Sequence, residues 1–293
     1  MKVNLRDITN NYRGYEELIS FYHNGKLCTD NTLEVDMSHA SWVDANLCAP
    51  LGAVLFSMCA DTGRIQLQSI NYELRKILDK NGFIMFFNPE QRKATDTYLT
   101  TIQFQRFERS ESYAFKEYME RHFVGKGIPQ MSQALHRKFR ESIFEIFENA
   151  VEHSKTEKGI FACGQFFPKK RKLDFSIADL GVGIRNNLYE FNKLDLPAEK
   201  AIMWALEGNN TTRQREDGKP GGFGLKLIRE FIRLNRGKIQ IVSDAGYWCF
   251  VNGEVETKGF SMPFPGTVVN IEINTADTQS YKLASEIDSN NIF

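Results

Sequence analysis

The sequence predicts an α/β protein built from two domains. Three observations predict this fold class: strand and helix patterns alternate within residues 32–87, a long amphipathic helix follows residue 131, and strand-like runs frame further helices after residue 159. The chain has 293 residues, which is long enough for two domains that each bury a core. We expect an N-terminal domain over 1–105, a connecting segment over 106–130, a second domain over 131–275 and a C-terminal tail over 276–293.

Composition narrows the class of protein. Hydrophobic residues make up 42% of the chain, charged residues 25%, and the formal net charge is zero, so nucleic acid is a poor candidate for its partner. The five cysteines form no CxxC pair, which disfavours a disulfide framework and a zinc site. The longest apolar run, residues 47–60, is shorter than the roughly 20 residues of a spanning helix. We therefore expect a cytoplasmic protein without a membrane anchor.

The N-terminal domain is expected to be a small sheet flanked by helices. Residues 32–37 alternate polar and apolar side chains, the pattern of a half-buried strand. The elements expected after it are an apolar helix that ends near Gly63, a strand over 64–70, a helix over 71–82, a strand over 83–87 and a further strand over 100–107. Alternation of this kind is typical of an α/β sheet domain.

The second domain is expected to begin with a long helix that contains "EIFENAVEHS", residues 145–154. At 3.6 residues per turn this helix divides into two stripes. The polar stripe contains Glu141, Glu145, Glu148, Asn149 and Glu152, and the apolar stripe contains Phe139, Ile143, Phe147 and Ala150. A polar stripe alone is most often a solvated helix face, so the rest of the sequence decides whether it has a function.

The remaining elements of this domain follow from shorter patterns. A helix is expected over 111–123, before the long helix. After it, we expect strands over 159–167 and 172–180, a short helix over 197–208, a helix over 222–237, and strands over 238–243, 247–251 and 266–273.

One candidate for chemistry is a pair of polar residues on the long helix. Glu145 and Asn149 lie one helical turn apart, so a carboxylate and an amide project side by side. A carboxylate can orient or deprotonate an attacking hydroxyl, and an amide oxygen is a hard ligand suited to Mg²⁺.

Two further motifs are rich in glycine. In "DLGVGI", residues 179–184, Asp179 can accept a hydrogen bond from an exocyclic amine, while Gly181 and Gly183 allow a ligand to approach the backbone. In "GKPGGFGLKL", residues 218–227, glycines lead directly into a helix whose free N–H groups suit a phosphate. This second stretch fits neither the Walker A pattern nor a Rossmann fingerprint.

With these motifs in this order, residues 130–275 resemble the ATP-binding domain of the GHKL superfamily, which includes gyrase-type topoisomerases, heat-shock chaperones, histidine kinases and mismatch-repair ATPases. "EIFENAVEHS" resembles the N box of that superfamily, "DLGVGI" its first glycine box, "GGFGLKL" its second, and "GTVVNIEI" its closing strand. The resemblance implies a Bergerat-type α/β sandwich with an ATP lid, and ATP and Mg²⁺ as cofactors.

The resemblance also implies roles for individual residues. Glu145 would activate or orient the nucleophile, and Asn149 would coordinate Mg²⁺. Asp179 would bind the adenine amino group with the help of Thr267, and the first-box glycines, Gly181 and Gly183, would shape the base pocket. The phosphate contacts would come from Thr211, Thr212, Arg213 and Lys219 in a lid over 185–220, and from Gly222, Gly224 and Leu225 after it.

Two features resemble one branch of the superfamily. The spacing of Glu145, Asn149 and His153 is similar to that of the serine kinases that act as anti-sigma factors. Residues 33–87 resemble a STAS domain, the fold of the antagonists that those kinases phosphorylate. Where such antagonists carry the phosphorylated serine, this chain reads "DANL", residues 44–47, without a hydroxyl. The N-terminal domain is therefore expected to be a docking or regulatory module, and a partner protein to accept the phosphate.

Three alternatives to a serine or threonine kinase stay open. A histidine kinase would use His122 or His136 as its phosphoacceptor, although neither is followed by an acidic residue. An ATP-gated switch would change its affinity for a partner with little turnover. An ATPase of the gyrase-like kind would form a homodimer through its N-terminal segments.

Overall fold

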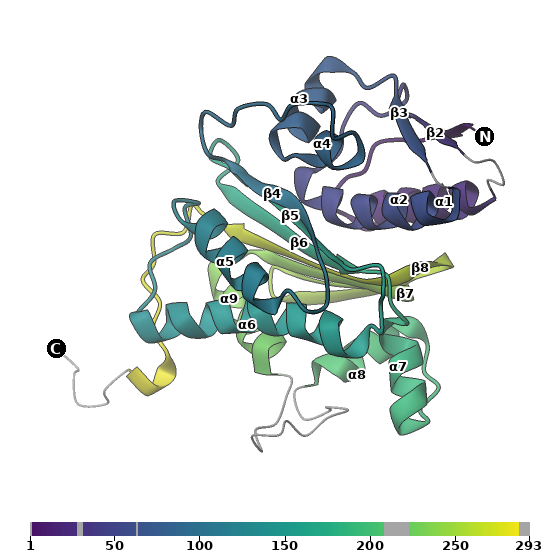
Figure 1. Cartoon of the computed structure of the whole chain (residues 1–293). Coiled ribbons are helices and arrows are strands. Elements are labelled where there is room, and N and C mark those ends of the chain that lie inside the picture. The colour runs from purple at the N-terminus through teal and green to yellow at the C-terminus, as the bar shows by residue number, and fades with distance from the viewer. Residues whose placement is uncertain (1, 28–31, 63, 208–222, 287–293) are drawn as a thin grey trace.

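The computed structural model describes residues 2–27, 32–62, 64–207 and 223–286 (Figure 1). It confirms the α/β class and contains two sheets. The N-terminal sheet consists of β1 (Lys2–Asn4), β2 (Leu33–Asp36) and β3 (Ile65–Gln68), in that spatial order and all parallel. The strands expected over 32–37 and 64–70 are thus confirmed as β2 and β3, whereas the three-residue β1 was not predicted.

Helices accompany the N-terminal sheet. They are α1 (Tyr12–Lys26), the 3₁₀ turn η1 (Ala45–Leu47), α2 (Cys48–Thr62), α3 (Tyr72–Lys80) and α4 (Phe83–Phe87). The helix α1, absent from the sequence prediction, begins after Asn11, whose side chain accepts a hydrogen bond from the Gly14 N–H at 3.1 Å and so caps it. The apolar helix expected to end near Gly63 and the helix expected over 71–82 are confirmed as α2 and α3.

The strand expected over 83–87 is wrong, because these residues form the short helix α4. Gly82 adopts a left-handed conformation with φ of 82°, and the Asn81 side chain accepts a hydrogen bond from the Phe83 N–H at 3.0 Å. Phe83 is fully buried and its ring lies 5.1 Å from that of Phe104. An unbroken apolar run fits a buried helix as well as a buried strand, so its composition could not decide between them.

The second sheet has five strands, each antiparallel to its neighbours. It contains β4 (Thr101–Phe107), β5 (Ile160–Phe167), β6 (Lys172–Asp179), β7 (Lys238–Val251) and β8 (Glu254–Asn274), in the spatial order β4-β5-β6-β8-β7. The strands expected over 238–243 and 247–251 are parts of the single strand β7, whose register shifts at Asp244. The boundary expected at residue 105 falls within β4, which pairs with β5.

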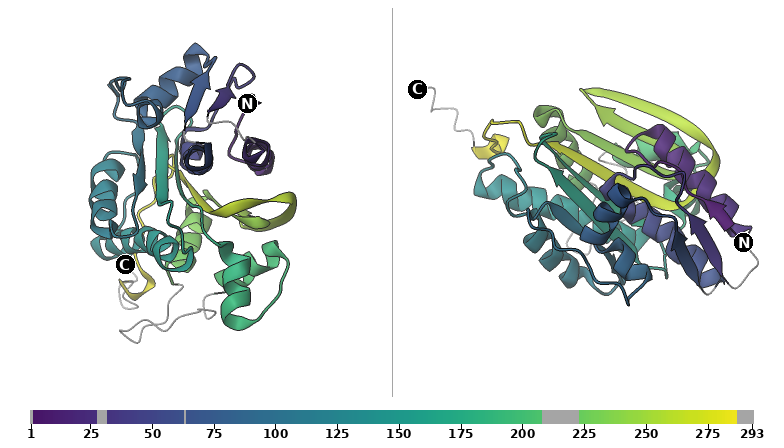
Figure 2. Two further views of the ribbon diagram at one scale, coloured as in Figure 1. Left: turned by 45° about the vertical axis from the view of Figure 1, so that its right-hand side comes forward. Right: turned by 90° about the horizontal axis from the view of Figure 1, so that it is seen from above.

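The β7–β8 pair continues beyond the end of β6 as a two-stranded ribbon (Figure 2). Helix α1 packs along this ribbon. Tyr12 donates its hydroxyl proton to the Gly259 carbonyl at 2.8 Å, and its ring stacks on Phe260 with centroids 4.7 Å apart. His23 Nε2 lies 2.8 Å from the Pro263 carbonyl oxygen. These contacts fix α1 to β8.

Helices cover one face of the five-stranded sheet (Figure 1). They are α5 (Ser112–Phe123), α6 (Gln133–His153), α7 (Gly183–Asn192), α8 (Ala198–Leu206) and α9 (Phe223–Asn235), with a short 3₁₀ turn η2 (Ala284–Glu286) near the end. The first turn of α6 is capped by Ser132, whose hydroxyl accepts from the Leu135 N–H at 3.1 Å. The apolar stripe of α6 is buried, as predicted, and α6 packs against α9. Helix α7 was not predicted.

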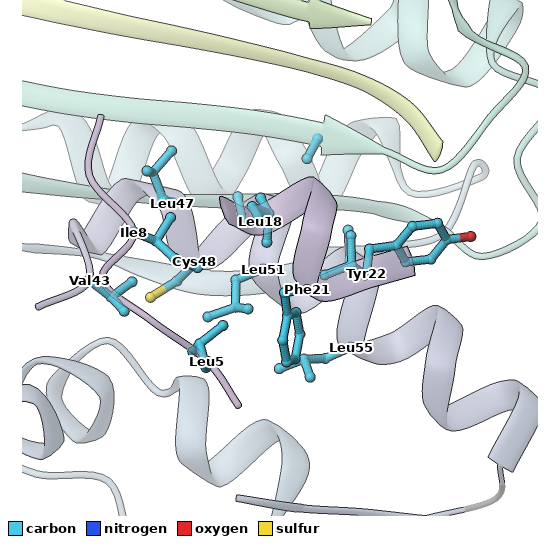
Figure 3. Packing of buried hydrophobic residues seen from close by; sticks show 14 of the residues in the cluster. Leu5, Ile8, Leu18, Phe21, Tyr22, Val43, Leu47, Cys48, Leu51 and Leu55 are labelled. Carbon is cyan, nitrogen blue, oxygen red and sulfur yellow. The ribbon is translucent and has the colours of Figure 1, made fainter. Parts of the chain in front are cut away.

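The N-terminal part packs on the opposite face of the same sheet. Helix α2 contacts β5 and β6, and one apolar core runs from α1 and α2 onto the sheet (Figure 3). Side chains alternate between the two cores: Ala178 and Val268 face the N-terminal part, while Ile177 and Val269 face the helices. The strands β6 and β8 therefore contact both layers. Among the described helices, none combines the length and apolar character needed to cross a bilayer.

Candidate functional site

The two candidate residues on α6 lie on its partly exposed side. Glu145 and Asn149 are both half-buried, one turn apart on a helix whose other side is fixed in the core. Glu148 on the same helix has a structural contact instead, since it accepts a hydrogen bond from the Ser112 hydroxyl of α5 at 2.6 Å. The polar stripe therefore includes a residue that ties two helices together, which its spacing alone could not reveal.

The loop after β6 rests on the C-terminal end of α6. A β-carbon added to Gly181 would lie 2.0 Å from the backbone oxygen of Ser154, so only glycine fits there. The Val182 N–H donates to that Ser154 oxygen at 2.8 Å, and the Asn187 side chain donates to the His153 carbonyl at 3.0 Å. These contacts satisfy carbonyl groups at the helix end and bring the first glycine motif to the helix that carries Glu145 and Asn149.

Asp179 ends β6 and is almost completely buried, with 5% of its surface exposed. The Gly181 N–H donates to its Oδ1 at 2.9 Å. Burial raises the pKa of this carboxyl group to about 7, although hydrogen bonds from the backbone of Gly181 and Thr267 oppose the shift. A carboxylate has about four acceptor positions, so these donors leave capacity for the amino group of a ligand.

Thr267 lies directly opposite Asp179 on β8. Its hydroxyl is 2.9 Å from the hydroxyl of Ser243 on β7, and the same Ser243 oxygen accepts a hydrogen bond from the Ile184 N–H at 2.9 Å. Gly183 has φ of 76°, and a β-carbon there would lie 3.3 Å from that oxygen. Three segments distant in sequence, those of Asp179, Ser243 and Thr267, thus meet at the end of β6.

Two residues of this cluster were missed by the sequence prediction. Ser243 links β7, β8 and the start of α7, but a single serine in a strand gives no signal of this role. Gly266 precedes Thr267, and a β-carbon there would lie 2.1 Å from the Asp179 carbonyl oxygen. Gly266 and Thr267 begin the predicted closing strand "GTVVNIEI". The sequence therefore pointed to this glycine but not to its contact with Asp179.

The expected phosphate-binding residues are described only in part. Gly224 and Leu225 lie in the first turn of α9, and Leu225 is half-buried against the core on the helix side of the sheet. The expected residues that lie outside the described part of the chain are Thr211, Thr212, Arg213, Lys219 and Gly222. The packing of α9 against α6 brings the end of this motif to the same side of the sheet as Asn149.

The fit to Mg²⁺ depends on ligands from outside the protein. Within the residues that the structure describes, no group of three or more His, Cys, Asp and Glu side chains could hold a metal ion. Mg²⁺ usually keeps several waters and binds through one or two protein oxygens together with substrate phosphates. The single amide of Asn149 suits that kind of site and would not suffice for a metal bound by protein alone.

The "DANL" segment is covered by the five-stranded sheet. Asn46 is fully buried, and its side chain donates to Ser176 Oγ at 3.0 Å and to Asn270 Oδ1 at 2.7 Å. Asp44 accepts hydrogen bonds from the Asn10 N–H at 2.7 Å and from the Trp42 indole at 2.8 Å. The segment is engaged in contacts within the chain.

The two histidine candidates lie in different environments. His122 on α5 is half-buried, and burial, together with nearby basic side chains, lowers its pKa to about 4. His136 is exposed in the first turn of α6. Neither residue belongs to the cluster around Asp179.

Comparison of the sequence with models of known protein families and with curated proteins finds no match.

Proposed function

We propose that the chain is an ATP- and Mg²⁺-binding regulatory protein whose second domain is of the GHKL type, and that it transfers phosphate to a serine or threonine of a partner protein. One observation carries the proposal: the contact of Gly181 with Ser154 brings the Asp179 loop onto the helix of Glu145 and Asn149. The order of elements also supports it, since α6 is followed by two paired strands, the glycine loop, the helices α7, α8 and α9, and two more paired strands.

In this proposal the residues have distinct tasks. Asp179 accepts a hydrogen bond from the adenine amino group, and the backbone at Gly181 and Gly183 leaves room for the base. Asn149 holds Mg²⁺, which neutralises charge on the phosphates. Glu145 orients the attacking hydroxyl and accepts its proton. The serine or threonine that is phosphorylated belongs to the partner.

The N-terminal part acts as a STAS-like regulatory or docking module in the same proposal. Its parallel sheet with flanking helices supports this assignment. Two further facts favour regulation over phosphoacceptance: residues 44–47 offer no hydroxyl, and the contacts of Asn46 bury that segment against β6 and β8.

The test is transfer of label from γ-labelled ATP in the presence of Mg²⁺, with and without an extract that contains partner proteins. A kinase labels a partner, whereas an ATPase releases free phosphate. Glu145→Gln should abolish either product while ATP still binds, because it removes the group that accepts the proton. Glu148→Gln on the same helix is the matched control and should keep the activity. Unchanged transfer in Glu145→Gln would reject the catalytic role.

A second candidate is an ATP-gated switch with little turnover. The strands β6 and β8 contact both the candidate site and the N-terminal part, which favours this candidate. A structural change at the site can therefore reach the N-terminal part through these strands. A non-hydrolysable ATP analogue separates the candidates. For a switch, the analogue alone changes hydrogen exchange in α1 and α2; for a kinase without this coupling, it protects only the site.

A further inference from the structure

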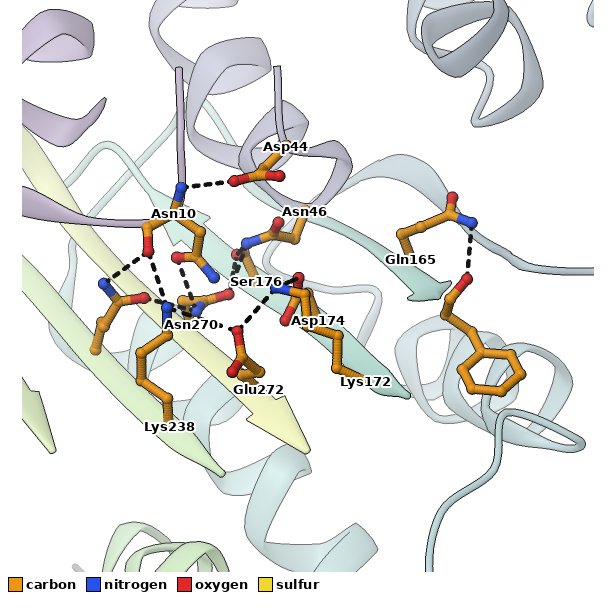
Figure 4. Close-up of polar contacts among 12 residues, drawn as sticks. Asn10, Asp44, Asn46, Gln165, Lys172, Asp174, Ser176, Lys238, Asn270 and Glu272 are labelled. Carbon is orange, nitrogen blue, oxygen red and sulfur yellow. Dashed lines mark hydrogen bonds and ion pairs between the residues drawn. The ribbon is translucent and has the colours of Figure 1, made fainter. Parts of the chain in front are cut away.

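A layer of polar side chains joins the N-terminal part to the five-stranded sheet (Figure 4). We call this layer the polar joint. Its buried members are Asn10, Tyr15, Asn46, Asp174, Ser176, Gln240 and Asn270. Its half-buried members are Lys172, Lys238 and Glu272. Asn270 lies at its centre, where its side chain donates to Asn10 Oδ1 at 3.1 Å and to Gln240 Oε1 at 2.9 Å. The joint interrupts an otherwise apolar contact.

Two carboxylates and two lysines lie within the joint. Asp174 on β6 is directly opposite Glu272 on β8, and its side chain is fully buried. Lys172 Nζ lies 2.8 Å from Asp174 Oδ2 and 2.9 Å from Glu272 Oε2. Lys238 Nζ lies 3.6 Å from Glu272 Oε2. The formal charges balance only while both carboxyl groups are ionised.

Hydrogen bonding in the joint is incomplete. Among the described residues, six buried side-chain polar atoms lack a hydrogen-bond partner, and five of them are here: Asn10 Nδ2, Tyr15 Oη, Asn46 Oδ1 and both oxygens of Asp174. Lys172 Nζ is at ion-pair distance from Asp174 Oδ2, but the angle between the two groups does not fit a hydrogen bond. An ionised carboxylate buried in this way is costly, and its neutral form costs much less.

We propose that the polar joint is a proton-operated contact: protonated Asp174 holds the N-terminal part against the sheet, and ionised Asp174 loosens it. Burial raises the pKa of Asp174 to about 7, and the neighbouring Glu272 charge adds to the shift, while Lys172 opposes it. The protonated acid can donate a hydrogen bond to Glu272, which the ionised form cannot. Docking therefore weakens as the pH rises from the ordinary aspartate value towards 7 and stays weaker above it.

The pKa values of the other ionisable groups that face Asp174 shift in different directions. Burial raises the pKa of Glu272, but Lys238 and Lys172 lower it more, so its pKa is below its ordinary range. Burial lowers the pKa of Lys172, but the two carboxylates hold it above its ordinary range. Burial also keeps the pKa of Tyr15 on α1 high. These three groups keep their charge state between pH 6 and 8.

Asp44 completes the charged surroundings of the joint. In the segment before η1, it accepts a hydrogen bond from the Asn10 N–H at 2.7 Å and adds one negative charge beside Asn10. Lys238 of the joint donates to the Asn10 carbonyl at 2.8 Å. Among the shifted pKa values of Asp174, Glu272, Lys172 and Tyr15, that of Asp174 falls within the range from 6 to 8.

The joint shares its strands with the candidate site. Asp174 and Asp179 lie on β6, and Glu272 and Thr267 lie on β8, but the two pairs face opposite sides of the sheet. Loosening at the joint would thus reach the strand ends that hold Asp179. This regulatory consequence rests on the proposed function, whereas the proton dependence of docking does not.

Hydrogen exchange of the full chain tests the proposal. Protection factors of α1 and α2 are measured at pH 6 and pH 8 in the wild type. If the pKa of Asp174 is about 7 in the docked state and about 3.9 in the loosened state, the protection factors of α1 and α2 should decrease about tenfold from pH 6 to pH 8. Unchanged protection of α1 and α2 between pH 6 and pH 8 would overturn the proposal.

Substitutions test whether Asp174 is the group that causes this pH dependence. Asp174→Asn has a similar volume but takes up no proton, so α1 and α2 should lose the pH dependence. Asp179→Asn, on the same strand but the other face, is the matched control and should keep it. If Asp174→Asn does not fold, Glu272→Gln serves instead, because removal of the neighbouring charge should move the decrease to lower pH. Retention of the wild-type dependence in the variant used would overturn the proposal. ATP is absent throughout, so a failure of nucleotide binding does not affect this result.

Discussion

Gly181 lies directly against Ser154: a β-carbon at Gly181 would stand 2.0 Å from the Ser154 backbone oxygen. The adjacent Val182 N–H donates to the same oxygen at 2.8 Å. This contact connects the end of β6 to the end of α6, and with it the carboxyl group of Asp179 to the helix of Glu145 and Asn149. The candidate site exists as one site because of this relationship.

Gly181→Ala should therefore displace the loop from the helix. We expect a loss of about 1–3 kcal/mol in the free energy of unfolding, the usual cost of forcing extra volume into a packed position, because the obstacle is backbone. Denaturant unfolding measures it. Gly259→Ala is the control, since a β-carbon there would meet no atom closer than 3.9 Å. Equal stability of the two variants would contradict the described contact.

Asp179 should make stability depend on pH. Its pKa is about 7 in the folded protein and near 3.8 in an unfolded chain, so folding favours the protonated form. The stability that this group contributes is greatest below its unfolded pKa and is lost as pH rises towards 7. Relative to Asp179→Asn, wild-type stability should fall between pH 4 and pH 7 by about 3 kcal/mol, with a slope of at most about 1.4 kcal/mol per pH unit.

Thermal or denaturant unfolding of both proteins across that range measures the difference. Asp174 contributes a dependence of the same sign in both proteins, so it cancels in the comparison. A constant difference between wild type and Asp179→Asn from pH 4 to pH 7 would show that burial does not shift this carboxyl group.

Ser243→Ala should loosen the start of α7. It removes the acceptor for the Ile184 N–H and the partner of the Thr267 hydroxyl, at an expected cost of about 1–3 kcal/mol. Hydrogen exchange in α7 and global unfolding both report the loss. Ser142→Ala is the control, because within the described part of the chain the Ser142 hydroxyl donates to the Lys138 carbonyl of its own helix, and that substitution should cost little. Equal protection of α7 in wild type and Ser243→Ala would count against the role of Ser243.

Periodicity predicted the elements whose pattern is long and regular. The apolar stripe of α6 repeats over several turns, and it is buried as expected. The alternation in residues 32–37 predicted β2 in the same way. The run over 83–87 has no polar residue to mark a face, so the sequence could not distinguish α4 from a strand. The three residues of β1 are too few to show a period at all.

Contacts between distant segments could not be predicted. The sequence could identify the glycines of "DLGVGI" as places where another group approaches the backbone closely. It could not show that this group is Ser154. Ser243 and Asn46 are single polar residues in strand and loop patterns, and their burial depends on which elements pack together. Likewise, the order of β6 and β8 in the sheet, which pairs Asp174 with Glu272, is a property of the topology.

Calorimetric titration with ATP and Mg²⁺ at pH 8 tests the central claim, that Asp179 and its loop bind adenine. Wild type should bind ATP, and GTP should bind at least about tenfold more weakly because guanine lacks the amino group at that position. Asp179→Asn should weaken ATP binding by roughly 10- to 100-fold, the range for a hydrogen bond to a charged group. Absence of ATP binding to the folded wild type, or equal affinity of wild type and Asp179→Asn, would contradict the account.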